Sequence, residues 1–449
     1  MNKPTGLVFF PAFDWAISPT HPEREERLLY TRDQIFEEGI LDLPEIVEYK
    51  PRLATVRDVA RIHTCVPTVA KQTTEAHLVA AGGALVLADA LMKGEIRNGF
   101  ALVRPPGHHA MRMVHGNRGF CNINNEAIMV QYLRQKYGVK RIAIVDTDVH
   151  HGDGTQEIFW HDPDVLFISF HQDGRTLYPG TGFINEMGGP RAYGSTINIP
   201  LPPETGDDGL LYVLDNLILP IIREFQPDLI VNSAGQDNHY TDPLANMQIT
   251  AQGYALLNKL LKPHLAVLEG GYAVESALPY VNLGIILAMA GLDFSHVVEP
   301  DNDPDRLEQK LEITEYISNV VNRLQADWRN REKLADRQLS PGQEFYERNK
   351  SIFYDTDYIQ EEQLERLRIC DHCPGYFSIE TKAGGNGAKN SALAITVPIQ
   401  ACERCQREAH QLYREAKARR EVDYIYLQEN VDDLYQVFDC HKGIESIQE

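Results

Sequence analysis

The sequence is short of cysteine and of positive charge, and it has no long hydrophobic run. It contains 7 cysteines in 449 residues, and 43 Lys and Arg against 64 Asp and Glu give a formal net charge of −21. So few cysteines, crowded toward one end of the chain, exclude a disulfide scaffold. Because so acidic a surface repels phosphate, we expect no nucleic-acid partner and no binding to anionic membranes.

Targeting signals are also missing from the sequence. The start, MNKPTGLVFFPAFDW, lacks the basic segment, long apolar core and small-residue cleavage site of a signal peptide. The most apolar run elsewhere, at 281–292, is too short to span a bilayer. We therefore expect a protein of the reducing cytoplasm, and its length allows about two or three domains.

The first two thirds of the sequence alternate short apolar runs with longer segments of helical pattern. The runs are apolar throughout rather than every second residue, which is typical of strands buried on both faces of a parallel sheet. The alternation predicts an α/β domain over residues 1–297. Strands are expected at 7–10, 101–104, 141–146, 165–169, 229–233 and 265–268, with helices at 75–92, 125–137, 210–225 and 253–262.

Polar, glycine-rich segments follow five of these expected strands. They read RPPGHHA, DVHHGDG, SFHQDG, SAGQDNH and EGGY in chain order. In α/β sheets, ligand-binding groups gather just past the carboxyl ends of the strands. The five segments are therefore predicted to form one active-site rim.

A metal site is predicted within this rim. Asp148 and His150 are one residue apart where a strand ends, so both side chains can reach one ion, and Asp237 is the best-placed third ligand. A catalytic zinc site needs three protein ligands and an open position for water. Two carboxylates and one imidazole also suit Fe²⁺, and an Asp-x-His pair alone is common in surface loops.

Two further histidines form a second group of candidates. His108 and His109 could be ordinary core histidines, but Asp146 and Asp153 are expected at the neighbouring strand end. A carboxylate behind an imidazole fixes its tautomer and raises its basicity. Two such pairs supply a base to activate water and an acid to protonate a leaving amine. Tyr272 adds a phenol that can donate a hydrogen bond to a developing oxyanion.

Seven motifs resemble, in order and spacing, the histone deacetylase superfamily, which includes acetylpolyamine amidohydrolases and bacterial histone deacetylase-like amidohydrolases. They are HPEREERL (21–28), RPPGHHA (104–110), GFCNINN (119–125), VDTDVHHGDG (145–154), YPGTG (178–182), SAGQDNHYTDPL (233–244) and LEGGY (268–272). The resemblance covers about residues 1–297. It implies an arginase-like and deacetylase-like three-layer α/β domain with a central parallel sheet.

The resemblance also implies metal ligands. It assigns the catalytic zinc to Asp148, His150 and Asp237. Family members also bind potassium nearby, and the matching positions here are Asp146, Asp148, His150, Ser169 and the carbonyl of Phe170.

Catalytic roles follow from the same resemblance. It makes His109 the general base with Asp153 behind it, and His108 the partner imidazole with Asp146 behind it. Tyr272 becomes the hydrogen-bond donor in the transition state.

A substrate tunnel is implied as well, with walls that suit an aliphatic, lysine-like stem. Phe120 and Tyr178 would form these walls, and Tyr178 stands where the family usually has Phe. Leu244 occupies a position where a polyamine-selective relative has glutamate, which favours acyl-lysine over acylpolyamine.

The last third of the chain lies outside the resemblance. Residues 298–369 are rich in charge, with apolar residues near helical spacing, and predict a charged helical linker. Residues 370–449 form an extension with two CxxC pairs, and we expect the whole C-terminal part to be mostly helical. The extension is also a candidate surface for self-association.

The four paired cysteines predict a structural zinc site. Two CxxC turns supply four thiolates, the usual ligand set of a closed tetrahedral zinc site. A mononuclear iron site and a redox dithiol pair remain alternatives, and His372, Cys440 or His441 could replace one ligand. The ligands expected are Cys370, Cys373, Cys402 and Cys405.

The sequence therefore predicts a zinc-dependent deacylase that acts on acylated lysine in proteins or peptides. An amidohydrolase for acylpolyamines or other small amides is the alternative within the same chemistry. A non-catalytic acyl-lysine or zinc-ribbon interaction protein is the alternative of another class, and it predicts binding without turnover. An arginase-type ureohydrolase is discarded, because such enzymes use two metals and different motifs.

Overall fold

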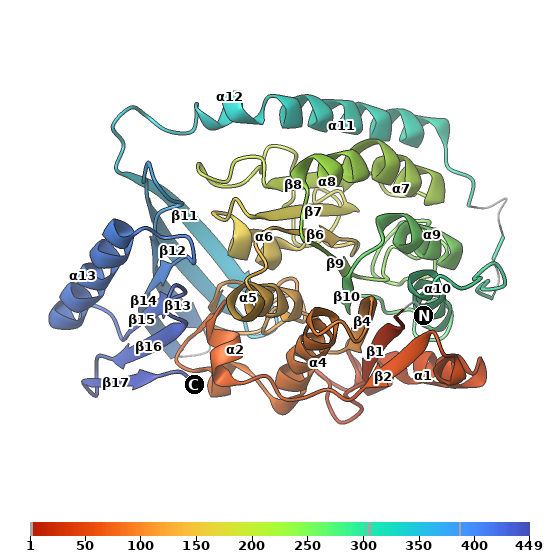
Figure 1. The fold of residues 1–449 in the computed structure, drawn as a ribbon, viewed down its shortest axis with the longest axis horizontal. Coiled ribbons are helices and arrows are strands. Elements are labelled where there is room, and N and C mark those ends of the chain that lie inside the picture. The colour runs from red at the N-terminus through yellow and green to blue at the C-terminus, as the bar shows by residue number, and fades with distance from the viewer. Residues whose placement is uncertain (1–2, 301, 304–306, 386–387) are drawn as a thin grey trace.

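A computed structural model describes residues 3–300, 302–303, 307–385 and 388–449. Its first part is an α/β domain built on eight parallel strands (Figure 1). In spatial order the strands are β2 (Ile46–Tyr49), β1 (Thr5–Phe10), β4 (Asn98–Val103), β10 (Leu265–Leu268), β9 (Leu229–Ala234), β6 (Ile142–Asp146), β7 (Val165–Gln172) and β8 (Thr196–Leu201). The predicted fold class is confirmed for this domain.

Helices cover both faces of this sheet, which explains why its strands are apolar throughout. Successive residues of one strand, such as Leu7 and Val8 in β1, are both buried but belong to opposite hydrophobic clusters. The helices of the first face are α1 (Leu29–Glu37), α7 (Asp207–Val213), α8 (Leu219–Phe225), α9 (Ala251–Leu261) and α10 (Leu278–Ala290). The helices that cover the opposite face of the sheet are α2 (Val56–Ala60), α4 (Glu75–Met92), α5 (Asn125–Tyr137) and α6 (Asp153–Phe159).

Helix α4 is long and apolar enough to span a membrane, by length and composition alone. Its mean hydropathy is 1.4 over 18 residues, and 61% of that stretch is buried. It packs against β1, β4 and α5, so its apolar surface covers the core of the domain.

A long helix crosses the domain after residue 310. Helix α11 (Leu311–Arg329) packs against α7 and β8 and runs along the top of the domain in Figure 1, followed by the short α12 (Arg331–Ala335). Its buried residues recur at helical spacing and join the core of the first domain: Ile313, Ile317, Val321, Leu324 and Trp328. The helical part of the predicted linker is thus packed on the domain.

The rest of the chain forms a second sheet, and here the prediction of a mostly helical extension was wrong. Seven strands form a mixed sheet, drawn in blue at the left of Figure 1. They are β11 (Phe345–Tyr354), β12 (Ile359–Arg368), β13 (Phe377–Gly385), β14 (Ala388–Val397), β15 (Tyr424–Glu429), β16 (Leu434–Asp439) and β17 (Ile444–Ile447). One helix, α13 (Glu403–Arg419), packs against β14 and β15.

The physical reason for this error lies in the buried face of β12. Glu361, Gln363, Glu365 and Leu367 are all buried, whereas Glu362 and Arg366 between them are exposed. The strand thus has the expected two-residue period, but three of the four inward residues are polar. Because hydrophobic periodicity is the main signal for a strand, this segment appears in sequence as a charged helix. The division of the chain at 297 and 369 stays a prediction, although the second sheet begins before 369.

Candidate active site

Three predicted metal ligands converge at the carboxyl edge of the sheet, just beyond β6 and β9. His150 Nδ1 lies 3.1 Å from a carboxylate oxygen of Asp148 and 3.1 Å from one of Asp237. The ligand atoms of all three lie within 4.8 Å of one another, and both carboxylates are fully buried. Two carboxylates and one imidazole are a donor set that Zn²⁺ or Fe²⁺ accepts while keeping an open position.

The backbone around these ligands fits a metal site. The Gly270 N–H donates to Asp148 Oδ2 at 2.7 Å, and the Val149 N–H donates to Asp237 Oδ1 at 2.9 Å. A Cβ atom at Gly270 would lie 2.2 Å from Asp237, and one at Gly235 would lie 2.0 Å from Asp148. Glycine at both positions leaves the carboxylates the space to converge, and the backbone N–H groups fix their orientation.

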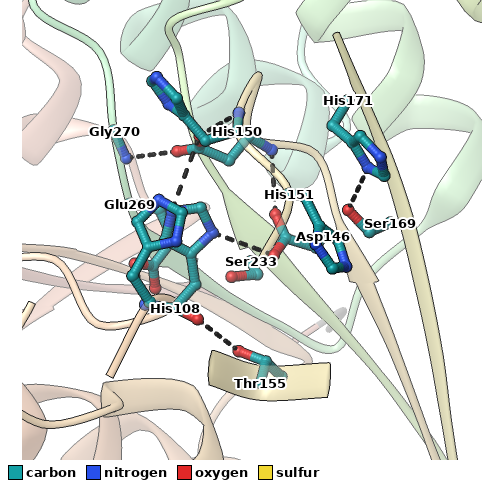
Figure 2. Close-up of polar contacts among 12 residues, drawn as sticks. His108, Asp146, His150, His151, Thr155, Ser169, His171, Ser233, Glu269 and Gly270 are labelled. Carbon is teal, nitrogen blue, oxygen red and sulfur yellow. Dashed lines mark hydrogen bonds and ion pairs between the residues drawn. The ribbon is translucent and has the colours of Figure 1, made fainter. Parts of the chain in front are cut away.

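Two His–Asp pairs lie beside the metal ligands. His108 Nδ1 is 3.1 Å from Asp146 Oδ2 (Figure 2), and His109 Nδ1 is 2.8 Å from Asp153 Oδ1. The two imidazole rings are 4.1 Å apart between centroids. Because the ionised Asp153 carboxylate only accepts hydrogen bonds, it orients His109 with the proton on Nδ1. Nε2 of neutral His109 is then left as a proton acceptor.

The electrostatic surroundings shift the pKa values of His108 and His109 in opposite directions. Burial, together with the adjacent His108, lowers the pKa of His109 to about 3 against the effect of Asp153. Burial also acts on His108, but the Asp148 and Asp146 carboxylates outweigh it and raise the pKa of His108 well above its ordinary value. Such a split is typical of an acid and a base that share one site.

The fully buried Arg27 and the largely buried Arg118 support the site, and neither was predicted as a site residue from the sequence. The Arg118 guanidinium contacts Asp153, with Nε 3.2 Å from Oδ2. Burial would raise the pKa of Asp153, but Arg118 and His109 hold it well below its usual range. The Arg27 guanidinium lies 5.0 Å from the centre of the Tyr272 ring. Arg27 could have been identified from its place in the HPEREERL motif. No sequence feature pointed to Arg118.

These groups open onto a cavity of about 310 Å³. All three predicted tunnel residues line it, and Phe120 meets the ring of Tyr272 edge to face at 5.6 Å. The lining also includes Asp355, which comes from the second sheet and was not predicted. The lining residues are Pro106, His108, His109, Gly119, Phe120, His150, Leu177, Tyr178, Leu244, Tyr272 and Asp355.

The residues expected to bind potassium come from the end of β6, the segment that follows it and β7. Asp146 pairs with Ser169 across β6 and β7, and the Ser169 hydroxyl is 2.9 Å from His171 Nδ1 (Figure 2). Phe170 follows Ser169 in β7 and is buried, while Asp148 and His150 belong to the metal trio. Potassium binding there stays a prediction.

The four paired cysteines come together between β12 and α13. Cys370 and Cys402 have sulfur atoms 3.9 Å apart, Cys373 and Cys405 3.6 Å, and all four sulfurs lie within 4.8 Å. Sulfurs bound to one zinc at about 2.3 Å in a tetrahedron lie about 3.8 Å apart. The observed spacing fits a structural zinc site, whereas Cys440, His372 and His441 are not members of this group.

Comparison with known proteins agrees with this geometry. The histone deacetylase domain family matches residues 64–282. A protein of Archaeoglobus fulgidus named "Probable deacetylase" is 48% identical over 326 residues, covering 66% of this chain and 89% of that protein. A histone deacetylase-like amidohydrolase of Pseudomonas aeruginosa is 35% identical over 240 residues, covering 51% of this chain and 62% of the relative.

A solved structure shares the fold. The crystal structure of the HDA15 HD domain aligns with a TM-score of 0.63 and 27% identity, covering 75% of this chain and 98% of that domain. The strand-end site and the relatives lead to the same conclusion. The chain belongs to the histone deacetylase family, and it is an enzyme of the deacetylase and amidohydrolase type, which hydrolyses acetyl amides.

Proposed function

We propose that this enzyme is a zinc-dependent deacylase that removes the acyl group from acylated lysine in proteins or peptides. One observation carries the proposal: His150 of the metal-ligand trio, the imidazoles of both His–Asp pairs and Tyr272 line a single cavity with apolar walls. Asp148, His150 and Asp237 would hold the zinc, which when bound polarises the amide carbonyl and acidifies a water molecule.

The side chains of the chain supply the proton transfers. His109 accepts a proton from the attacking water at Nε2, while Asp153, 2.8 Å from Nδ1, keeps the ring in the required tautomer. The Tyr272 hydroxyl donates a hydrogen bond to the carbonyl oxygen as that oxygen gains negative charge. The carbon–nitrogen bond then breaks as His108 or His109 gives a proton to the leaving amine.

The cavity walls support an acyl-lysine substrate. Phe120, Tyr178 and Leu244 present hydrocarbon surface to the space that leads to the metal ligands. Such walls suit the four methylene groups of lysine. An amidohydrolase for acylpolyamines or other small amides is the second candidate, since the same walls also accept a diamine chain.

Two further ions belong to the proposal. A structural zinc at Cys370, Cys373, Cys402 and Cys405 is supported by the spacing of their sulfur atoms. A closed site of four thiolates has no open position, so it stabilises the second sheet and takes no part in catalysis. A potassium ion near Asp146 and Ser169 is supported by the resemblance alone.

A substrate panel tests this function. Metal-loaded enzyme is incubated with acetyl-lysine peptide, longer acyl-lysine peptides and acetylputrescine, and the released acid is measured. We expect release from all three classes, with the largest kcat/KM on an acyl-lysine peptide. No release from any substrate would refute the proposed function, and a preference for acetylputrescine would favour the second candidate.

A further inference from the structure

The turn between β11 and β12 reaches the mouth of the active-site cavity. Asp355, the first residue of this turn, lines the cavity although it comes from the second sheet. Among the described residues that line the cavity, it is the one carboxylate, and its side chain is partly exposed. The other lining groups are the catalytic histidines, Tyr272 and mostly apolar walls.

The turn is held in place by the loop that bears Asn117 and Arg118. Asp357 accepts the Asn117 N–H at 2.6 Å, and the Thr356 hydroxyl donates to Asn117 Oδ1 at 2.7 Å. The Arg118 guanidinium donates to the Phe353 carbonyl at 2.7 Å. Asp355 therefore has a defined position relative to the catalytic groups, because the loop that bears Asn117 and Arg118 also carries Phe120.

The partners of Asp355 are neutral donors. The Tyr178 hydroxyl donates to Asp355 Oδ2 at 2.7 Å, and the Gly119 N–H lies 3.2 Å and 3.3 Å from the two oxygens. No Lys, Arg or His forms an ion pair with it in the part of the chain that the structure describes. The nearby Arg118 already pairs with Asp153. Asp355 thus has no direct ion-pair partner among the described residues at the mouth of the cavity, and Arg118 and His21 act on its charge only at longer range.

We propose that Asp355 forms a subsite for a positively charged nitrogen on the part of the substrate that stays outside the tunnel. This inference rests on the proposed function, and it names the substrate class that the site prefers. An ionised carboxylate beside low-dielectric walls attracts a cation more strongly than it would in open water. The hydrocarbon walls deeper in the cavity offer that cation no partner, so it stays at the mouth.

Two kinds of substrate can supply such a nitrogen. One is a lysine or arginine side chain beside the acylated lysine of a peptide, and the other is the distal ammonium of a small acylated diamine. Both place a cation a few bonds beyond the acylated stem. Matched substrate pairs that differ in this charge distinguish the two.

The test measures kcat/KM of the metal-loaded full-length enzyme on two such pairs. The first pair is acetyl-lysine peptides with arginine or its neutral analogue citrulline beside the acetyl-lysine. The second is N-acetylputrescine and N-butylacetamide. Because an accessible ion pair contributes up to about 1 kcal/mol, we expect the cationic member of at least one pair to be favoured about fivefold. The favoured pair identifies the source of the cation.

Two variants then separate charge recognition from structure. Asp355→Asn keeps the shape of the side chain, and we expect it to reduce the ratio within the favoured pair to about one. Glu362→Gln removes the same charge from the exposed face of β12, outside the cavity lining and outside the contacts that hold the turn, so the ratio should stay at the wild-type value. High salt should lower the wild-type ratio, because it screens accessible charges.

The outcomes that overturn the inference are distinct from failure of the proposed function. Equal kcat/KM within both pairs for the wild-type enzyme would overturn the inference alone, as would a ratio that Asp355→Asn leaves unchanged. A loss of activity by the same factor on both members of a pair would assign Asp355 a structural role only. No turnover of any of the four substrates would refute the proposed function and the inference with it.

Discussion

At the scale of single residues, the position of Tyr272 shows how packing can prepare a catalytic hydroxyl. Its ring lies between Phe120 and the buried Arg27, and its side chain is 8% exposed. Its backbone N–H donates to Asp242 at 2.7 Å. The ring is therefore fixed before substrate binds, which is what a donor to a developing oxyanion requires.

Replacing Tyr272 with phenylalanine tests this role. We expect kcat to fall about 10²–10³-fold with little change in KM, because the lost hydrogen bond forms mainly in the transition state. The measurement is steady-state kinetics on an acetyl-lysine peptide. Tyr212→Phe, on the exposed surface of α7, is the matched control and should retain full activity. Unchanged kcat in Tyr272→Phe would refute the proposed mechanism.

Single residues also show what the sequence could and could not predict. Asp148, His150 and Asp237 were predictable because each follows a recognisable strand, and parallel strands end at one edge of a sheet. The roles of Arg118 and Asp355 were not predictable, because each contacts a residue that is far away in the sequence and is brought near only by the tertiary fold.

At the scale of elements, β12 joins the two parts of the molecule through buried charges. Glu365 on its inward face accepts from Arg348 Nε at 3.1 Å and Lys350 Nζ at 3.1 Å, and its carboxylate is 2.9 Å from His161 Nε2. Burial would raise the pKa of Glu365, but Lys350, Arg348 and His161 hold it well below its usual range. This cluster, and not an apolar stripe, occupies that part of the interface.

The substitution Glu365→Gln should therefore destabilise the protein by about 3 kcal/mol at pH 7, because it removes the buried carboxylate shared by Arg348, Lys350 and His161. Since the folded pKa is depressed, the stabilisation exists above the unfolded pKa of about 4.3 and is lost as pH falls through the folded value. The difference from wild type should thus narrow below about pH 4.

Urea unfolding of both proteins at several pH values measures this difference. Glu362→Gln, on the exposed face of the same strand, is the matched control and should change stability by less than about 0.5 kcal/mol. A difference for Glu365→Gln that stays constant down to the lowest accessible pH would contradict the assigned ion pairs.

The four-cysteine group ties the start of α13 to the end of β12. Cys402 is the N-cap residue of α13 and Cys405 lies in its first turn, so a bound zinc would hold the helix against the sheet. Small cysteine-bound units often fold only with their metal. The loss of one ligand should therefore unfold part of the C-terminal segment.

Limited proteolysis of Cys402→Ser tests that expectation. We expect lower zinc content and new cleavage sites within residues 370–449, while the first domain stays intact. Cys440→Ser is the control, because Cys440 is buried in the same hydrophobic cluster but outside the four-cysteine group. The same cleavage pattern in Cys402→Ser and wild type would refute a structural metal at this place.

At the scale of the whole molecule, the second sheet is part of the active-site rim. It packs on the first domain through contacts such as Tyr354 Oη to the Met113 carbonyl at 2.8 Å and Gln428 Nε2 to the Ala60 carbonyl at 2.9 Å. Its β11–β12 turn then reaches the cavity mouth. The catalytic domain and the extension are thus joined where substrate would enter.

The sequence predicted the first domain far better than the second. Helices α4 and α5 have the expected bounds, because strongly apolar or well-capped segments can be recognised from their own residues. Strands β2 and β8 were missed, and so was the second sheet, whose inward face is partly polar. The burial of a polar residue depends on partners far along the chain, such as His161 for Glu365. The residues next to it in the sequence therefore do not predict that it is buried.

The central claim is that one metal site on this scaffold hydrolyses an acyl-lysine amide. The most direct test is acetate release from an acetyl-lysine peptide by the full-length enzyme, measured after chelation and again after zinc is restored. We predict turnover that chelation abolishes and zinc restores in the wild type, but not in Asp237→Ala, which lacks one of the three ligands. Equal acetate release with and without metal, or full activity of Asp237→Ala, would contradict the account.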